Sequence, residues 1–324
     1  PPFGVIQGHN TQTMLSGEAF WIQKRVLEWA DFPKIETLDQ YFDLITAYLK
    51  ENPQSDGKDN IGFEILCDDW RYFCLENPNE GCAIVDEKTQ KASVYDTLPE
   101  AKQYYHKLCQ MFGQNVIDPE TFTLSFSQYV DKISSGNVLG FVDQYWQIMD
   151  AQNILYANGK DDRTYVPLPI TVDQKIKGKY NCSELNLNTG TGLGISVDCK
   201  DVEGALQFLN DLLSPDVMVL RYWGEEGIDY EVDEKGIFYR TEEQRNNWSN
   251  GDYLKENSCS YTYFPAYEGM LADGINTVLP AEQPGEYYQK LSEYDKKVLD
   301  AYGFQTWKEF LGEEVEGNPW FPLY

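Results

Sequence analysis

The chain has 324 residues, which is long enough to bury a sizeable core and predicts about two domains. Its 26 Lys and Arg residues against 53 Asp and Glu residues give a formal charge of −27, and no basic cluster offsets it. Because a polyanion or an acidic membrane surface would be repelled by that charge, we expect no nucleic-acid partner.

Other features of the composition narrow the class of protein. Aromatic residues make up 15% of the chain, so we expect some of these rings to line a recognition surface. No stretch approaches the roughly 20 apolar residues of a membrane-spanning helix. The seven cysteines form no C-x-x-C pair, which favours buried free thiols over disulfides or metal ligands. With two His residues, a zinc site or a His-based triad has little to build on.

The first part of the chain alternates strand and helix patterns. Phe3–Ile6 predicts a short strand and Ala19–Trp29 predicts a helix. The strongest helix pattern follows a capping-box sequence at Thr37 and ends at Asn52-Pro53. Ile61–Leu66 then has the pattern of a strand.

The middle of the chain continues this alternation. A second capping-box sequence at Thr97 predicts a helix that Gly113 closes, and a third helix is expected from roughly Ser127 to Ser135. Val138–Val142 has the pattern of a short buried strand, and Tyr165–Leu168 that of an extended segment.

The last part of the chain begins with a glycine-rich strand, Gly190–Val197, whose spacing fits neither nucleotide-binding fingerprint. It runs into a helix that ends before Pro215, and Asp233-Glu234-Lys235-Gly236 then has the composition of a hairpin turn. The tail is mostly helical. Taken in order, these elements predict an α/β architecture with parallel or mixed sheets.

A candidate ligand site follows the strand Val138–Val142. Asp143, Gln144, Tyr145 and Trp146 would lie beyond its carboxyl end, where open α/β sheets bind small molecules. An aromatic face can stack on the C–H face of a sugar, while carboxylate and amide groups bind its hydroxyls. We predict that Trp146 stacks on a sugar, the alternative being a core aromatic. Gln144 and Tyr145 could equally be turn and core residues.

Five stretches of the sequence form a pattern when they are taken in chain order. They are Phe20–Arg25 followed by Pro33–Leu38, Asn52–Lys58, Ser135–Gly140 leading to Trp146, Thr191–Ser196, and Gly224–Tyr230. In this order they resemble the family 1 extracellular solute-binding proteins that feed ABC importers, the class of maltose-binding protein. The last stretch resembles the lipoprotein-type subgroup of Gram-positive bacteria, whose members often take up oligosaccharides.

This resemblance implies a periplasmic-binding-protein-like fold of type II, in which two α/β lobes are joined by hinge strands. Residues 1–183 would form mainly the second, C-terminal lobe, with the first hinge crossing near Pro1. Residues 184–190 would form a second hinge crossing, and 191–324 a return segment into the first lobe plus a helical tail shared between the lobes. The opening strands of the first lobe have no counterpart here, so we predict a fragment of a longer precursor.

The resemblance also suggests further ligand contacts. Relatives have acidic and aromatic contacts in the loop after Ile61–Leu66, which here carries Asp69, Trp70 and Arg71. We expect contact by Trp70 and Asp69, with a solvated charged loop as the alternative. Two more aromatic groups are weaker candidates. Tyr222 and Trp223 end a helix before Gly224, where packing is as good an explanation as binding, and Tyr261, Tyr263 and Tyr267 form an aromatic run near a possible rim of the cleft.

The loop from Asn52 to Asn60 resembles a loop that binds calcium in some members of that family. Amides replace carboxylates at several positions here, which leaves Asp56 as the main charged ligand. Calcium favours several anionic oxygens, so we expect an empty turn and no metal.

The resemblance therefore predicts a non-enzymatic receptor without a cofactor, which captures a carbohydrate between two lobes and delivers it to a membrane permease. We expect a monomer outside the cell, lipid-anchored to the membrane through a segment that this sequence does not contain. One alternative is a glycan-cleaving enzyme, which needs two carboxyl groups about 5 to 9.5 Å apart. Others are a binding protein for a non-sugar solute such as a peptide, and a protein that uses its aromatic patches to bind another protein.

Overall fold

The computed structural model describes residues 18–67, 83–86, 89–94, 97–174, 182–183, 193–258, 264–267, 269–312 and 315–316. The expected strand at Phe3–Ile6 and the expected hinge at 184–190 lie outside these residues. The chain separates into two compact units. The larger unit comprises Met14–Cys182 and Ser292–Tyr324, and the smaller unit Pro1–Thr13 and Ser183–Leu291.

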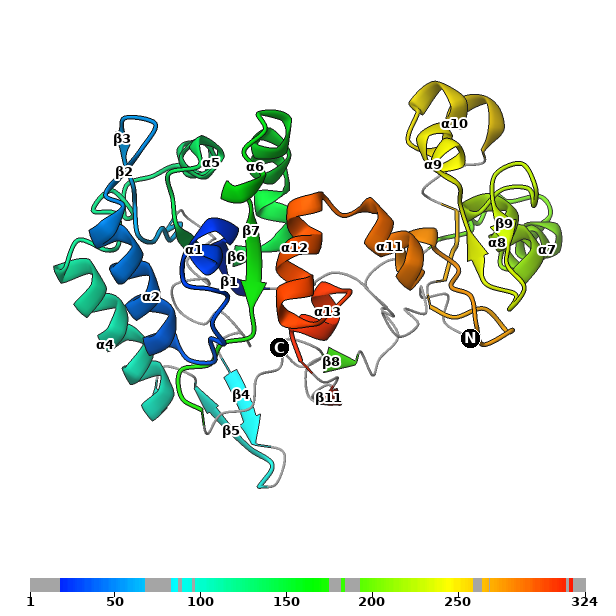
Figure 1. Cartoon of the computed structure of the whole chain (residues 1–324). Coiled ribbons are helices and arrows are strands. Elements are labelled where there is room, and N and C mark those ends of the chain that lie inside the picture. The colour runs from blue at the N-terminus through cyan, green and yellow to red at the C-terminus, as the bar shows by residue number, and fades with distance from the viewer. Residues whose placement is uncertain are drawn as a thin grey trace. The chain divides into compact units, whose positions relative to one another are not determined.

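The larger unit carries a sheet with helices on both of its faces (Figure 1). Its described elements are β1 (Glu18–Gln23), α1 (Lys24–Trp29), α2 (Leu38–Glu51), β2 (Gln54–Ser55), β3 (Lys58–Asp59), β4 (Ala83–Asp86), β5 (Lys91–Val94), α4 (Pro99–Gly113), α5 (Phe126–Ser135), β6 (Gly140–Gln144), α6 (Tyr145–Ala157), η3 (Asp161–Arg163), β7 (Tyr165–Leu168), α12 (Glu293–Tyr302), α13 (Trp307–Phe310) and β11 (Val315–Glu316). The two-residue strand β8 (Cys182–Ser183) stands at the boundary between the units in the sequence.

Strand β1 lies between β6 and β7 and runs antiparallel to both. Glu18 is opposite Gln144 and Ile22 is opposite Gly140, so β1 spans the full length of β6. Parallel bridges from Ile61 to Val138 and from Glu64 to Phe141 add a further segment beside β6. The sheet is therefore mixed, as the alternation of elements predicts.

The apolar pattern of Ala19–Trp29 predicts a helix over the whole segment, and this prediction is wrong for its first part, because the helix begins only at Lys24. Phe20, Trp21 and Ile22 are all buried, since a strand in the middle of a covered sheet is enclosed on both faces. Such a strand shows a continuous apolar run, which cannot be distinguished from a buried helix by periodicity alone.

The two faces of β1 pack against different helices. Phe20 contacts the rings of Tyr41 on α2 and Tyr104 on α4, at centroid distances of 5.6 and 6.3 Å. Trp21 points to the other face, where it belongs to a buried cluster with residues of α5 and α6. Tyr41 also donates a hydrogen bond from its hydroxyl to the Trp21 carbonyl oxygen at 2.7 Å, which joins α2 to the sheet.

Two other predicted elements differ from the structure, while the predicted helix near Ser127–Ser135 is confirmed as α5. Residues 61–66 form isolated bridges rather than a strand, because Phe63 bridges to Ile117 while its neighbours bridge to the opposite side. Helix α4 begins at Pro99 without a capping side chain, since the Thr97 hydroxyl donates to the Val94 carbonyl oxygen instead. Helix α5 does have a capping box, formed by Ser125 and Gln128.

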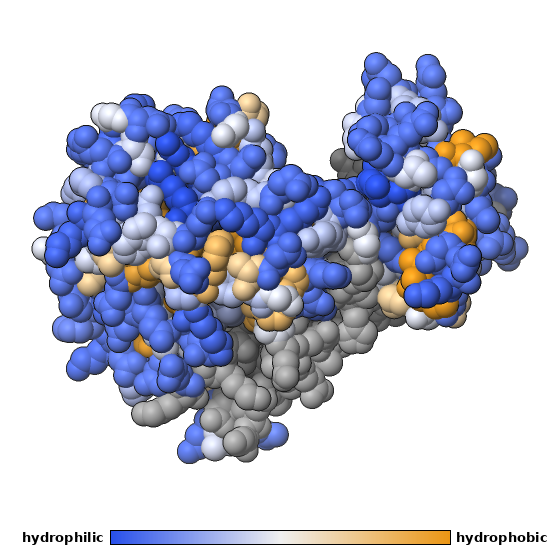
Figure 2. Space-filling view, in the orientation of Figure 1, coloured by the Kyte–Doolittle hydropathy of each residue, from blue (hydrophilic) through white to orange (hydrophobic). Residues whose placement is uncertain are grey.

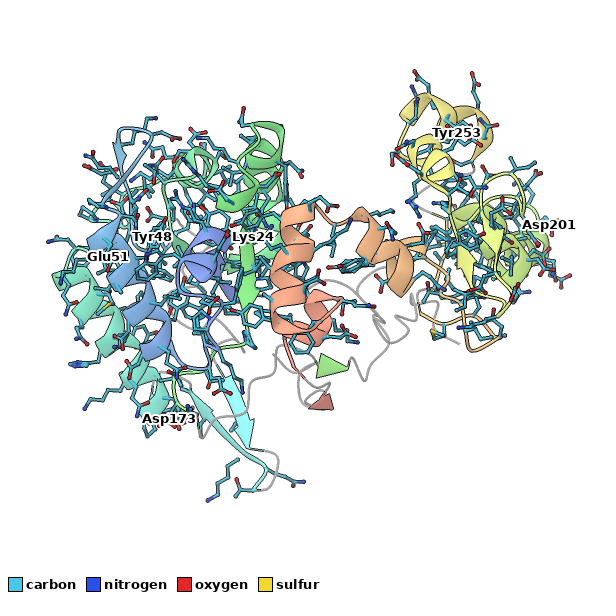
Figure 3. All side chains as sticks on the ribbon, in the orientation of Figure 1. Lys24, Tyr48, Glu51, Asp173, Asp201 and Tyr253 are labelled. Atoms are coloured by element: carbon cyan, nitrogen blue, oxygen red, sulfur yellow. The ribbon has the colours of Figure 1, made fainter. Side chains whose placement is uncertain are left out.

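The last helices of the chain return to the larger unit through a buried ion pair. Lys24 is fully buried and pairs with Asp295 of α12. The Tyr156 hydroxyl on α6 donates to Asp295 at 2.8 Å and accepts from the Lys24 ammonium at 3.0 Å. Figure 3 shows Lys24 between α1 and α12. These bonds fix α12 against α1 and α6.

The smaller unit is mainly helical. Its described elements are α7 (Val202–Leu212), α8 (Pro215–Tyr222), β9 (Glu231–Val232), β10 (Phe238–Tyr239), α9 (Glu242–Trp248), α10 (Gly251–Asn257), η4 (Pro280–Glu282) and α11 (Pro284–Lys290). The predicted hairpin around Asp233–Gly236 is confirmed as β9 and β10. Pro215, expected only as the stop of a helix, also begins α8, because proline is tolerated at the first position of a helix. The segment 193–197 is not a strand.

Candidate functional site

The candidate site is the junction where β6 ends and α6 begins. The predicted strand was expected to end at Val142, but it continues through Asp143 and Gln144, because both residues pair with the start of β1. Tyr145 and Trp146 then form the first turn of α6. The four residues therefore do lie at the carboxyl end of a central strand, where open α/β sheets bind ligands.

Trp146 is the residue of this group that solvent reaches most readily. Its exposed fraction is 53%, while Ile148 on the same helix is fully buried. Met149, one helical turn after Trp146, is 41% exposed and extends the apolar surface. An indole in the hydrophobic core would be almost fully buried, so Trp146 is not the core aromatic that was the alternative.

Tyr145 and Gln144 lie half-buried beside it. The Tyr145 ring packs at a centroid distance of 6.1 Å from Trp21, and burial raises the pKa of its phenol. Tyr145 therefore packs one part of its ring against Trp21 and exposes only the rest to solvent.

Asp143 is enclosed, with an exposed fraction of 1%. Its Oδ1 atom accepts a hydrogen bond from the backbone N–H of Gln144 at 2.7 Å, and its backbone carbonyl oxygen accepts one from the Trp21 indole at 2.9 Å. Asp143 thus fixes the end of β6 in this structure, and its contact with a ligand stays a prediction.

The other residues predicted to contact a ligand do not belong to this junction. Asp69, Trp70 and Arg71 lie outside the described residues, as do Tyr261 and Tyr263. Trp223 is fully buried in the smaller unit, where its ring packs against Tyr230 and Phe238 and its indole donates to the Thr277 carbonyl oxygen. Tyr222 and Tyr267 pack against the Met218 cluster of that unit. Packing explains these three aromatic residues.

A buried polar cluster that the sequence pattern did not reveal lies just before residues 69–71 in the chain. Glu64 is fully buried, and its Oε1 atom accepts a hydrogen bond from the Thr121 hydroxyl at 2.6 Å. Burial, together with a hydrogen bond to the Asp118 carboxyl, raises the pKa of Glu64 to about 8. Asp118 in turn pairs with Lys132. The one signal in the sequence is a glutamate inside an otherwise apolar run.

Two cavities among the described residues of the larger unit lie away from the β6–α6 junction. One of about 310 Å³ is lined by Asn60, Asp118 and Lys132 among others, and one of about 650 Å³ runs along α4 past Tyr105 and His106. Within the described residues, no group of three or more His, Cys, Asp or Glu side chains is placed to hold a metal ion.

The surface is in keeping with the acidic composition. Figure 2 shows that hydrophilic residues cover most of the visible face of each unit. Among the described residues, none of the helices combines the length and the apolar character needed to cross a bilayer.

No protein-family model matches this chain, and no curated protein matches it. Among solved structures, the chain is similar to an HMO-binding, ABC-transporter-associated solute-binding protein from Bifidobacterium longum infantis. The two are 16% identical with a TM-score of 0.54, over 84% of this chain and 56% of that one. The fold is that of a solute-binding protein.

Two further structures show the same likeness. An alginate-binding protein without calcium ion is 11% identical, with a TM-score of 0.51 over 97% of this chain and 60% of that one. An EF-hand mutant of an ABC-transporter substrate-binding protein from S. pneumoniae, in complex with fructo-nystose, is 15% identical, with a TM-score of 0.50 over 95% and 60%. The chain therefore spans less than two thirds of the length of these structures. The predicted α/β fold of two-lobed solute-binding proteins is confirmed.

Proposed function

We propose that this chain belongs to the substrate-binding component of an ABC importer and captures a carbohydrate, with Trp146 as the surface on which a sugar ring stacks. The observation that carries this proposal is an exposed indole at the end of a central strand in a solute-binding-protein fold. An exposed indole offers a flat apolar face on which the C–H face of a sugar ring can stack. The names of the three similar structures include HMO, alginate and fructo-nystose.

The remaining parts of the proposal follow from this role. The protein has no enzymatic activity, acts as a monomer outside the cell and is lipid-anchored to the membrane. Closure of two lobes around the sugar creates contacts that exist only in the closed state, so that binding shifts the population toward it. The closed form is then recognised by the membrane permease. Gln144, Tyr145 and the loop at Asp69–Arg71 supply further contacts to the sugar.

The test is calorimetry of the full-length protein against milk, fructose-based and alginate oligosaccharides, with native protein and the Trp146→Ala variant. We expect one of these glycans to bind, and Trp146→Ala to weaken its binding at least about tenfold, because a buried aromatic contact carries that much free energy. Trp29 is also exposed, at 40%, but lies on α1 beyond the other end of β1, so Trp29→Ala is the matched control.

Two results would contradict the proposal. Equal affinity of native protein and Trp146→Ala would show that this indole is not the stacking surface. Absence of binding to every glycan, together with tight binding of a peptide, would exclude the carbohydrate. Release of shorter sugars from the same mixtures, followed by thin-layer chromatography, would identify a glycan-cleaving enzyme instead.

A further inference from the structure

The loop Asn52–Asn60 is held by donor groups from other parts of the larger unit. Strands β2 and β3 form a hairpin whose turn residues, Asp56 and Gly57, have left-handed φ angles of 53° and 77°. This turn directs several oxygen atoms of the loop toward its inner side. Because the loop resembles one that binds calcium in some solute-binding proteins, these oxygens are candidate calcium ligands.

Three of these oxygens already converge on one amide group. Asn137, in the turn between α5 and β6, donates from Nδ2 to the carbonyl oxygens of Ser55 and Lys58 at 3.1 and 3.3 Å. The same nitrogen lies 3.3 Å from Oδ1 of Asn60. Asn137 is 5% exposed, so its amide nitrogen occupies the point where a cation bound by these oxygens would lie.

The charged oxygens of the loop are paired as well. Arg163 of η3 donates to both carboxylate oxygens of Asp56, at 2.7 and 2.9 Å, and Lys160 lies 3.2 Å away. These hydrogen bonds hold the pKa of Asp56 at about 2. The other carboxylate, Asp59, accepts a hydrogen bond from the Gln54 amide at 2.7 Å.

This donor set does not fit calcium. Calcium binds six to eight oxygen atoms, several of them anionic, and it would have to displace two cationic side chains that repel it. Removing Arg163 from Asp56 would also break a bidentate pair, which is the strongest geometry available to a carboxylate and a guanidinium.

We propose that the protein supplies the cation of this loop itself. Arg163 and Lys160 neutralise Asp56, and Asn137 fills the space between the loop oxygens. We call this group, Asp56 with Asn137, Lys160 and Arg163, the internal cation clip. It closes the loop at any calcium concentration, and it does not depend on which ligand the protein binds.

The clip joins segments that are distant in the sequence. Asn137 precedes β6 and Arg163 precedes β7, the two strands that flank β1, so the hairpin fixes the start of both. Arg25 of α1 adds a hydrogen bond to the Ser55 hydroxyl at 2.9 Å. The clip thereby holds the end of the sheet opposite to the β6–α6 junction.

The experiment measures the thermal unfolding midpoint of the full-length protein in millimolar CaCl2 and in EGTA. We expect the same midpoint in both solutions. We expect Asp56→Ala and Arg163→Ala each to lower it by a few degrees, and the double variant to lower it no further, because both changes break the same pair. Lys255→Ala, which removes one partner of an exposed pair with Asp252, is the matched control and should leave the midpoint unchanged.

Several results would overturn the proposal. A rise of the native midpoint in CaCl2 that Asp56→Ala abolishes would show that the loop binds calcium. Additive losses in the double variant, or no loss in either single variant, would show that the clip does not hold the loop. If Arg163→Ala does not fold, Arg163→Lys retains the charge without the bidentate fork, and it should be less stable than native protein and equally insensitive to CaCl2.

Discussion

The buried carboxyl group of Glu64 makes the stability of the larger unit dependent on pH. Its pKa is about 8 in the folded protein against an ordinary value of 4.5, mainly because burial disfavours the charged form. The folded state therefore keeps the proton between these two values, while the unfolded state releases it. The stabilisation due to this proton is complete below pH 4.5 and is lost as the pH rises through 8.

The size of this effect follows from the two pKa values. One pKa unit corresponds to about 1.4 kcal/mol, so the free energy of unfolding loses about 5 kcal/mol from pH 4.5 to pH 8 through this group, of which about 3 kcal/mol is lost by pH 7. Glu64→Gln removes the ionisation and keeps the shape. Its amide oxygen accepts from the Thr121 hydroxyl, and its amide nitrogen donates to Asp118 in place of the proton.

The assay is urea unfolding of native protein and Glu64→Gln, followed by tryptophan fluorescence from roughly pH 4 to pH 9. The contributions of the other carboxylates cancel in the difference between the unfolding free energies of native protein and Glu64→Gln. We expect Glu64→Gln to gain stability relative to native protein as the pH rises, by about 5 kcal/mol in total. Glu51, exposed at the end of α2, provides the control Glu51→Gln, whose difference from native should stay flat. If the unfolding free energies of native protein and Glu64→Gln change with pH in parallel, Glu64 does not keep its proton in the folded protein.

Two further changes test the packing of the larger unit. Gly140→Ala would place a methyl group 2.1 Å from the Tyr41 hydroxyl and 3.0 Å from the Trp21 carbonyl oxygen, so we expect a loss of about 1–3 kcal/mol in urea unfolding. Gly113→Ala, where the added atom meets nothing within 4 Å, should not lower the free energy of unfolding measurably. Lys24→Met leaves Asp295 without its buried cation and should cost about 3–5 kcal/mol. If hydrogen exchange in α12 stays as slow as in native protein, the ion pair does not anchor that helix.

Helix α2 shows what the sequence alone could predict. Its apolar residues recur at helical spacing, Thr37 and Gln40 form the expected capping box, and the helix ends within two residues of the predicted position. The hairpin of β9 and β10 was predicted for the same reason, because a turn and its flanking residues are adjacent in the chain. Periodicity, caps and turns are local interactions, so they can be recognised without knowing the fold.

Strand β1, Trp146 and Trp223 show what could not be predicted from the sequence alone. β1 was mistaken for helix, because its burial on both faces depends on β6 and β7, more than a hundred residues away. Trp146 and Trp223 both stand at the boundary of a helix, yet one is 53% exposed and the other fully buried. The difference comes from what packs against each ring, which no local pattern encodes.

The sequence by itself determined the acidic charge, the amphipathic helices and the candidate residues at the end of β6. The tertiary structure decided which of those residues face solvent, that Asp143 is enclosed, and that Arg163 reaches Asp56 across 107 positions of the chain. It also brought Glu64 beside Asp118. Burial and ion pairing depend on atoms that are close in space and distant in sequence, and only the folded chain brings them together.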